Sequence, residues 1–306
     1  MSRETTWARI GSDVSGFTTV DQILTKAGLD YTVVKEPMFL RDGVEVKTRI
    51  ATVKTRPEDQ FRPALREAAG VVSDRYTILQ NQDAFRFLEE IPNIEFVRAG
   101  ETYNGMVYII GKLPSLRVVD DEFTPFVIFQ NSHNGWFSLR ATICPLRIVC
   151  QNQFNLSFGE MQNTISIRHS SRIESAMAEA QQLLRDTALY MQGFTNTALE
   201  LAQLKLTDAD RNRICDAFFN ATKAVTERQQ ELLAEKKAAL ARCYNDDDNS
   251  NYRGTAWGLL NAATDLETHK ARKASENSRD SAFLNVTFDS NEINRLLRII
   301  RDTVHA

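Results

Sequence analysis

The sequence predicts an α+β fold: an N-terminal antiparallel β-sheet with few helices, followed by a helical C-terminal half. Residues 124–152 contain two β-branched and aromatic runs on either side of an Asn-Gly pair at 134–135, a dipeptide typical of tight hairpin turns. From residue 171 onwards, apolar residues instead recur at the helical spacing of three and four. We therefore expect an antiparallel sheet domain with short helices over 1–170 and a helical region over 171–306, packed on the sheet or following it.

Two helices are predicted in the N-terminal part. Thr19 and Gln22 form a capping box ahead of a helix that ends at Gly28, and Asn81 is placed to cap a helix that runs to Ile91. The remaining residues of this part are expected to form strands and loops. Strands are expected over 31–39, 44–55, 94–98, 103–112, 125–130, 136–151 and 165–167, and residues 71–72 and 76–79 are expected to be extended. The hairpin of 94–112 is expected to turn at Ala99-Gly100, and 57–70 to be a charged loop or a short helix.

The second strand of the central hairpin carries two specific expectations. Leu139, Ala141 and Ile143 alternate with polar residues, which predicts one buried face and one solvent-exposed face. The apolar phase changes after Pro145, which predicts a β-bulge or an edge position there. Helices are then expected over 173–188, 197–204, from Thr207 with its capping partner Asp210, and over 225–240, 254–273 and 289–304, with an acidic linker at 245–251.

Composition excludes several classes of protein. The chain has 306 residues, 42% of them hydrophobic and 25% charged, which is ordinary for a globular protein and argues against disorder. A net charge of −3 argues against a protein whose whole surface binds nucleic acid, although a local basic face remains compatible with it. No segment has the length and apolarity of a signal peptide core or a membrane span, so we expect a cytoplasmic protein with no membrane partner.

No motif for catalysis, a cofactor or a metal is present. The four cysteines and four histidines lack metal-ligand spacing, and the chain contains no phosphate-binding glycine loop and no nucleophile elbow. Three consecutive aspartates at 246–248 point their carboxylates apart, which is more typical of a solvated linker than of a magnesium site. We expect no cofactor and no metal, and nothing in the sequence favours an enzyme.

Basic and amide side chains provide the stronger functional signal. Arginines on the strands, next to aromatic residues, suit a single-stranded nucleic acid lying along a sheet, because guanidinium groups bind phosphates and exposed rings stack on bases. Equally, arginines on the solvent side are what any half-buried sheet needs, and the amides of Gln151 and Asn152 suit either a ligand or the backbone at the end of a strand. The candidate nucleic-acid-binding residues are Arg56, Arg75, Tyr76, Arg140, Arg147, Gln151, Asn152, Arg168, His169 and Arg172.

Five stretches together resemble the phage/plasmid-like family of domains of unknown function, which bacteriophages, plasmids and prophages carry. They are TVDQILTKAGLDY after Trp7, VVSDRYTILQNQDAFRFLEE at 71–90, FQNSHNGWFSLRATICPLRIVCQN at 129–152, SIRHS at 166–170 and GTAWGLLNAATDLETH at 254–269. The resemblance covers most of the chain, and only the entry to the turn at Phe129-Gln130 departs from a more aliphatic pattern. It implies an accessory protein of a mobile element in the cytoplasm of a bacterial host, and no particular reaction.

Three functions follow as hypotheses. The first is a non-enzymatic protein that binds or anneals single-stranded DNA during recombination or replication, as a homo-oligomer that extends its basic face. The second is a phage protein that binds and inhibits a host defence protein through its helical half. The third is a nucleotide-binding protein, which requires the candidate arginines and amides to converge on one concave pocket.

Overall fold

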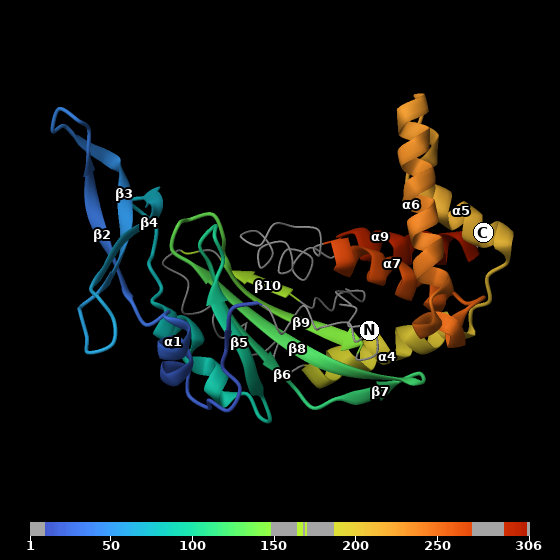
Figure 1. The fold of residues 1–306 in the computed structure, drawn as a ribbon, viewed down its shortest axis with the longest axis horizontal. Coiled ribbons are helices and arrows are strands. Elements are labelled where there is room, and N and C mark those ends of the chain that lie inside the picture. Colours follow the sequence, from blue (N-terminus) through green and yellow to red (C-terminus); the bar gives the residue numbers. More distant parts are fainter. Residues whose placement is uncertain (1–9, 148–163, 168, 170–186, 271–290, 305–306) are drawn as a thin grey trace.

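The α+β prediction is confirmed (Figure 1). In this computed structural model, antiparallel strands make up the N-terminal half of the chain and helices make up the C-terminal half. The residues that it describes are 10–147, 164–167, 169, 187–270 and 291–304.

Among these residues, seven strands form the larger sheet, and all of its neighbouring strands are antiparallel. The strand order is β1-β5-β6-β8-β9-β10, and β7 pairs with β8 beside this path. The strands are β1 (Ser12–Asp13), β5 (Glu95–Glu101), β6 (Met106–Lys112), β7 (Leu116–Val118), β8 (Asp121–Ser132), β9 (Leu139–Arg147) and β10 (Thr164–Ile167).

The hairpin β8–β9 at the centre of this sheet is the one predicted around the Asn-Gly pair. Its register runs without a shift along the whole ladder, so the alternative of a β-bulge at Pro145 is wrong. Pro145 lies directly opposite Pro125. The described part of β10 pairs with β9 only as far as Thr142, and the missing amide hydrogen of Pro145 therefore interrupts no bond to β10.

The hairpin β5–β6 turns later than predicted. The turn lies at Thr102–Gly105, where Gly105 has a φ of 80°, and the prediction of a turn at Ala99-Gly100 is wrong. Gly100 lies inside β5 and serves packing instead. A Cβ atom there would come within 2.8 Å of the hydroxyl oxygen of Tyr108, so the glycine makes room for that ring.

Both faces of the larger sheet are buried, so the expectation of a solvent-exposed face on β9 is wrong. One face contributes to the main core, and the opposite face holds a smaller apolar cluster that includes Tyr108, Ile128 and Cys144. Thr142 was expected on the exposed face, yet it is fully buried and shares a hydrogen bond of 3.0 Å with Thr164. Hydroxyl groups alternate with apolar residues here because neighbouring strands satisfy them, not because water does.

A second sheet of three strands projects from the body of the molecule (Figure 1, left). It consists of β2 (Thr32–Phe39), β3 (Glu45–Arg56) and β4 (Leu65–Ser73), and we call these strands with their connecting turns the arm. The first two strands are as predicted. The prediction of a loop or short helix is wrong from Leu65 onwards, because pairing with β3 makes this charged segment a strand.

Two short helical segments lie between the arm and the larger sheet. Helix α1 (Val20–Ala27) is confirmed, with Thr19 as its N-cap and Gly28 in the left-handed conformation at its end. The helix expected from Asn81 consists of α2 (Asn81–Phe85) followed by the 3₁₀ helix η2 (Arg86–Glu90). Asn81 does not cap it, because its buried side chain donates instead to the carbonyl of Leu29, at 2.9 Å.

The helical half packs on the larger sheet. Trp257 is fully buried, and its ring lies 6.3 Å from that of Phe123 in β8 and 6.0 Å from that of Phe194. One continuous core therefore spans both halves of the chain. The elements of this half are α4 (Thr187–Gln203), α5 (Asp208–Phe218), η3 (Ala221–Lys223), α6 (Glu227–Asn245), η4 (Asp247–Tyr252), α7 (Ala256–Lys270) and α9 (Asn291–Val304).

Two features of the helical half bear on its predicted elements. The capping box of Thr207 and Asp210 at the start of α5 is confirmed. The segment expected as a solvated linker is largely the 3₁₀ helix η4, and Asn249 within it is buried and donates to the carbonyls of Tyr244 and Gly258 at 3.1 and 3.0 Å. Backbone carbonyls of the neighbouring helices thus fix a segment whose composition alone resembles a loop.

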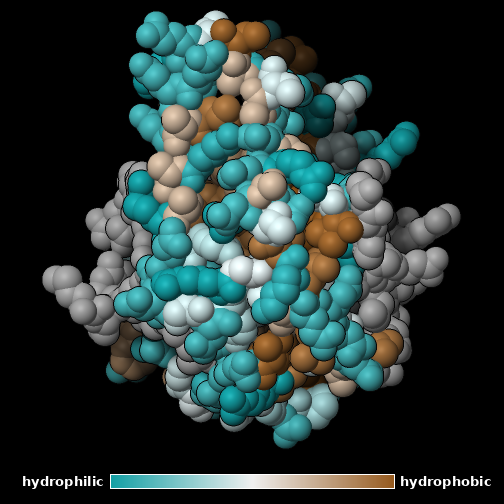
Figure 2. All heavy atoms as spheres, turned by 90° about the vertical axis from the view of Figure 1, so that its right-hand side faces the viewer, coloured by the Kyte–Doolittle hydropathy of each residue, from teal (hydrophilic) through white to brown (hydrophobic). Residues whose placement is uncertain are grey.

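Helix α6 projects from this end of the molecule (Figure 1, right). No residue from Glu227 to Ala239 is buried, and the first buried side chain is that of Leu240. Viewed from this side, the surface is mostly hydrophilic, and the hydrophobic patches on it are small and separated (Figure 2).

Candidate nucleic-acid interface

The ten candidate residues do not form one basic face. Six of them lie within the described residues, and the structure places these on different parts of the molecule. The four that lie outside the described residues are Gln151, Asn152, Arg168 and Arg172.

Arg147 joins the larger sheet to the helical half and is not exposed. It is 2% exposed, and its guanidinium forms an ion pair of 2.7 Å with Asp121 and donates to the carbonyl of Asp248, also at 2.7 Å. The same group lies 5.5 Å from the centre of the Tyr252 ring. A buried guanidinium that a carboxylate already neutralises is unavailable to a phosphate.

Arg56, at the end of β3, is also compensated. It lies 3.6 Å from Asp30, which accepts two further hydrogen bonds from Arg62, both at 2.8 Å. Burial by itself would raise the pKa of Asp30, but the hydrogen bonds from Arg62 hold it below its ordinary value. These three residues form a local ion-pair cluster at the base of the arm.

Tyr76 and His169 stack on each other instead of offering free rings. Their centroids are 4.9 Å apart with an angle of 22° between the planes, and both residues are buried. The Tyr76 hydroxyl donates to the carbonyl of Ser132 at 2.9 Å. Burial lowers the pKa of His169 to about 4, so its imidazole is neutral at physiological pH.

Arg140 and Arg75 are the two remaining candidates. Arg140 is half-buried on β9, and its Nε atom donates to the Ser138 hydroxyl at 3.4 Å. Arg75 is exposed just after β4, and its side chain forms no ion pair or hydrogen bond with any described residue. Of the six described candidates, Arg75 is therefore the one that keeps an exposed and uncompensated charge.

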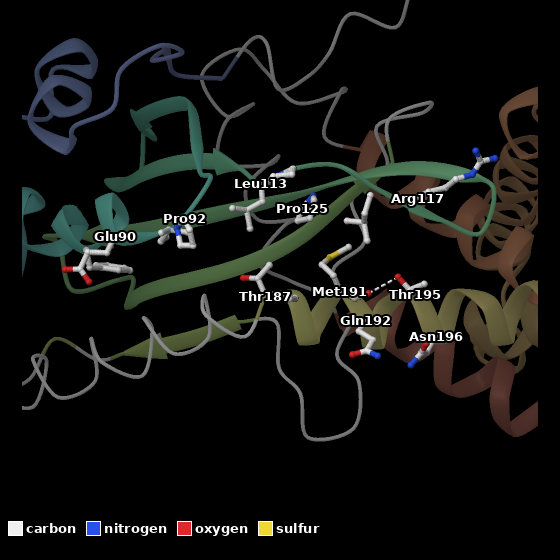
Figure 3. Close-up of a pocket in the computed structure, with 15 residues that line it drawn as sticks. Glu90, Pro92, Leu113, Arg117, Pro125, Thr187, Met191, Gln192, Thr195 and Asn196 are labelled. Carbon is white, nitrogen blue, oxygen red and sulfur yellow. Dashed lines mark hydrogen bonds between the residues drawn. The ribbon is translucent and has the colours of Figure 1, made fainter.

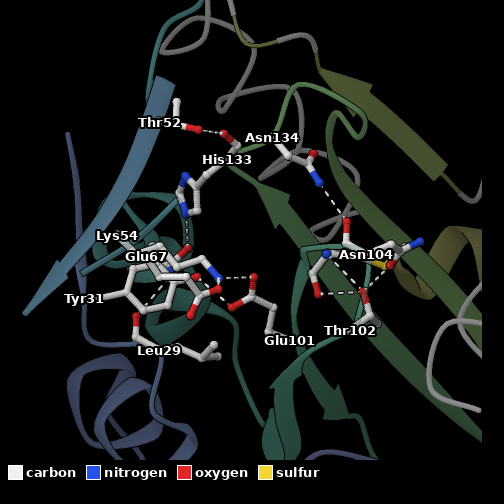
Figure 4. A network of polar contacts seen from close by, with 12 residues as sticks. Leu29, Tyr31, Thr52, Lys54, Glu67, Glu101, Thr102, Asn104, His133 and Asn134 are labelled. Atoms are coloured by element: carbon white, nitrogen blue, oxygen red, sulfur yellow. Dashed lines mark hydrogen bonds and ion pairs between the residues drawn. The ribbon is translucent and has the colours of Figure 1, made fainter. Parts of the chain in front are cut away.

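A buried polar cluster fastens the arm to the larger sheet (Figure 4). Lys54 of β3 forms an ion pair of 2.6 Å with Glu101 of β5, and Glu101 also accepts from the Tyr31 hydroxyl at 3.1 Å. Thr52 donates to the carbonyl of His133 at 2.6 Å, in the turn of the central hairpin. Burial, together with the Glu101 carboxylate, raises the pKa of Tyr31. This cluster of Tyr31, Thr52, Lys54, Glu101 and His133 holds the arm against the larger sheet, and we call it the joint. Sequence reasoning missed it because its members come from separate segments of the chain.

His133 lies inside this joint as a neutral base. It is 2% exposed, and its Nε2 atom lies 2.9 Å from Oδ1 of Asn81. The Asn81 amide nitrogen already donates to Leu29, so Oδ1 acts as the acceptor and Nε2 of His133 carries the hydrogen. Burial, with smaller contributions from His169 and Lys54, lowers the pKa of His133 to about 3.

Exposed cations gather on the arm. Arg49 is three residues from Thr52 in the regular part of the β3–β4 ladder, so it lies on the side opposite Thr52 and Lys54, away from the larger sheet. Lys47, where the register between β2 and β3 shifts, is exposed beside it. With Arg41 at the tip, they are exposed, and their side chains form no ion pair with any described residue. We call the surface that carries Lys47 and Arg49 the outer face of the arm.

Exposed aromatic side chains lie at the arm and beside it. Phe39 at the tip is 60% exposed, and Trp136 in the turn of the central hairpin is 78% exposed. That turn touches the arm directly, because a Cβ atom on Gly70 of β4 would come within 2.5 Å of the Cα atom of Asn134. The combination of cations and exposed rings is one that binds single strands.

The chain belongs to the family described as Domain of unknown function (DUF932). The family model matches residues 68–290, which includes the central hairpin and most of the helical half. A search of curated proteins and a search of solved structures found no match. Within the described part of the chain, no group of histidine, cysteine and acidic residues is arranged to hold a metal ion, and no helix is long and apolar enough to cross a membrane.

Proposed function

We propose that this DUF932 protein binds single-stranded nucleic acid on the outer face and tip of the arm. The observation that carries the proposal is the set of exposed cations there that no described carboxylate neutralises: Arg41, Lys47 and Arg49, with Arg75 at the end of β4. Arg147 of the larger sheet does not take part, because it is buried and paired. The interface therefore differs from the one that the sequence predicts.

The geometry of a strand suits an extended polyanion. Lys47 and Arg49 are two residues apart on β3 and both are exposed, so they place two cations next to each other along the strand. Phe39 at the tip offers a ring on which a base stacks, which contributes about 1–3 kcal/mol for each base. Contacts of this kind bind the phosphate backbone of the nucleic acid and discriminate little between base sequences.

The role that we propose is annealing or protection of DNA during replication or recombination of a mobile element. The resemblance to phage and plasmid proteins supports this setting. Contacts to the backbone would leave the base edges free to pair with a complementary strand. We further propose that the protein acts as a homo-oligomer, in which several arms bind one strand.

Fluorescence anisotropy of a labelled oligo(dT) across a salt series tests the binding. We expect affinity to fall steeply as salt rises, because cations that bind phosphates release counterions. The double variant Lys47→Gln/Arg49→Gln should bind more weakly, and its salt slope should be smaller by about 0.7 for each lost phosphate contact.

A matched control removes the same charge elsewhere. Arg228→Gln/Lys236→Gln changes two exposed cations on α6 and should leave both affinity and salt slope unchanged. Equal losses in the two double variants would show that binding depends on net charge alone and not on the arm. Absence of binding to oligo(dT) at low salt would refute the proposal altogether.

A second candidate function is binding to a host protein through the helical half. The observation that favours it is the projection of α6, whose residues from Glu227 to Ala239 are not buried by any part of the described chain. Affinity purification with nuclease treatment tests it. A single host protein recovered by the wild type, and lost on deletion of residues 227–239 without loss of oligo(dT) binding, would support this function over the first.

A further inference from the structure

Two turns at one end of the larger sheet lie next to each other and carry exposed aromatic rings. One is the β5–β6 turn at Thr102–Gly105, and the other is the β8–β9 turn that follows Ser132. Both leave the same edge of the sheet, because β6 pairs with β8 from Met106 and Ser132 onwards. Tyr103 in the first turn is 91% exposed, and Trp136 in the second is 78% exposed. Neither side chain makes a hydrogen bond or a ring contact with any described residue.

The side chain of Asn134 ties these two turns together (Figure 4). Its Nδ2 atom donates to the carbonyl of Asn104 in the β5–β6 turn at 2.7 Å, and its Oδ1 atom accepts from the backbone N–H of Trp136 at 2.9 Å. Gly105, with a φ of 80°, leaves room for this link, since a Cβ atom there would come within 2.8 Å of Nδ2. The backbone beneath both rings is therefore fixed, although the rings themselves are in water. Ordered and uncovered apolar side chains of this kind mark an interaction surface.

Cations lie beside the two turns. Arg75 is exposed and forms no ion pair with any described residue, and its neighbour Tyr76 donates to the carbonyl of Ser132 at the start of the β8–β9 turn. Lys35, also exposed, donates to the backbone carbonyl of Asp74 at 3.2 Å. The carboxylate of Asp74 shares this surface with the two cations, so the local charge stays positive. Exposed rings next to unpaired cations match a strand that carries both bases and phosphates.

An apolar pocket elsewhere on the molecule suits a nucleic acid strand less well. It has a volume of about 780 Å³ and lies between η2, the segment that joins β6 to β7, and α4 (Figure 3). Arg117 is the one cation among its described lining residues, but it alternates in β7 with Leu116 and Val118, and its guanidinium points away from the cavity. The exposed carboxylates of Asp120 and Glu122 share the surface of Arg117. No cation of the described lining therefore faces this pocket.

We propose that Tyr103 and Trp136 receive unpaired bases of the single strand that the arm binds, with one base stacked on each ring. The inference rests on the function proposed for the arm, and it adds that the protein selects unpaired bases as well as phosphates. Lys35 and Arg75 bind the phosphates next to the stacked bases. An internal base of a duplex has both faces covered by its neighbours, so the substrate class is single-stranded nucleic acid. Stacking occupies the faces of the bases and leaves their edges free to pair.

Fluorescence anisotropy of the full-length protein with two labelled strands tests the proposal. Oligo(dT) carries bases, and an abasic strand of equal length carries the same phosphates without them. The wild type should bind oligo(dT) at least about tenfold more tightly, because each stacked base contributes a factor of about five or more. Tyr103→Leu/Trp136→Leu removes both rings from exposed positions and should bind the two strands equally. Its salt slope should equal that of the wild type, because no phosphate contact is lost.

A matched control removes a ring of similar exposure elsewhere. Phe61, in the turn between β3 and β4, is 86% exposed, and Phe61→Leu should keep the full preference for oligo(dT). The fluorescence difference between the wild type and Trp136→Leu isolates the emission of Trp136, which oligo(dT) should quench and the abasic strand should not.

The outcomes separate this inference from the function of the arm. Equal binding of both strands by the wild type would overturn the inference and leave backbone binding by the arm intact. Binding of neither strand would overturn the proposed function, and the inference with it. A preference for oligo(dT) that survives in the double ring variant, or that Phe61→Leu also abolishes, would overturn the inference. So would a double ring variant that dissociates into smaller assemblies in sedimentation while its binding to both strands is unchanged, since the rings would then cover a second copy of the chain.

Discussion

Mild acid should unfold this protein more readily, because two buried histidines must remain neutral in the folded state. His133 and His169 are 2% and 9% exposed, and burial lowers their pKa values to about 3 and about 4. His133 lies in the joint between the arm and the larger sheet, where its carbonyl accepts a hydrogen bond from Thr52 of β3. His169 stacks on Tyr76, whose hydroxyl donates to the carbonyl of Ser132 next to His133. Their protonation therefore works against the joint.

The direction of the effect follows from the two pKa values of each group. An unfolded histidine has a pKa of about 6.5, which is above the folded values. Above that pH, both states hold the neutral form and stability is unaffected. As the pH falls below the unfolded pKa, the histidines bind protons in the unfolded state but not in the folded state. The free energy of unfolding therefore decreases until the folded pKa is reached.

The magnitude can be worked out for a drop from about pH 7.5 to about pH 5.5. At the lower pH, one unit below the unfolded pKa, each histidine removes about 1.4 kcal/mol, and the two together remove about 3 kcal/mol. Carboxylates contribute little in this window. Asp30, whose pKa is lowered by Arg62 against the effect of burial, loses its contribution only at lower pH, around and below the ordinary carboxyl pKa of about 3.9.

Urea denaturation at the two pH values measures the loss. His169→Phe keeps a ring against Tyr76 and His133→Gln keeps a donor for Asn81, so each variant should remove about half of the pH dependence. The double variant should show almost none. A wild type that is equally stable at both pH values, or a double variant that still loses about 3 kcal/mol, would refute the argument from burial.

Three further predictions concern stability. Gly70→Ala should lower the free energy of unfolding by about 1–3 kcal/mol, because its Cβ atom would come within 2.5 Å of the Cα atom of Asn134. A melting temperature equal to that of the wild type would show that the arm can shift to make room without cost. Arg147→Met should cost about 3–5 kcal/mol by leaving the Asp121 carboxylate, 11% exposed, without its cationic partner. Arg147→Met/Asp121→Leu should recover most of this loss, and additive losses in chemical denaturation would contradict the reasoning. Thr207→Ala should cost about 1 kcal/mol through loss of the capping box of α5, and Thr207→Ser, which retains the hydroxyl, should restore stability in the same assay.

Local patterns predicted most of the elements because their causes are local. The cap at Thr19, the glycine stop at Gly28 and the capping box at Thr207 act within one turn of helix, and all three appear in the structure. The Asn-Gly turn of the central hairpin is local in the same way. Where the prediction failed, a distant partner decided: β4 is a strand because β3 pairs with it, and η4 is ordered by carbonyls of the flanking helices.

The candidate site was harder to predict than the fold, for a related reason. A sequence shows that an arginine is present on a strand, but its counter-charge comes from elsewhere in the chain. Arg147 meets Asp121 across a hairpin and the helical half through Asp248, and Arg56 meets Asp30 from before the arm. Only folding reveals which cations are neutralised. Lys47 and Arg49 remain exposed because the arm projects beyond the reach of the body's carboxylates.

The sequence by itself determined the class of fold, the order of strands before helices and the hairpin at the centre of the larger sheet. These depend on hydrophobic period, turn residues and caps, which act between neighbours along the chain. The tertiary structure alone decided that both faces of that sheet are buried, and that two of the four described candidate arginines, Arg56 and Arg147, are paired with carboxylates. Burial and charge pairing arise between residues far apart in sequence, so no local pattern encodes them.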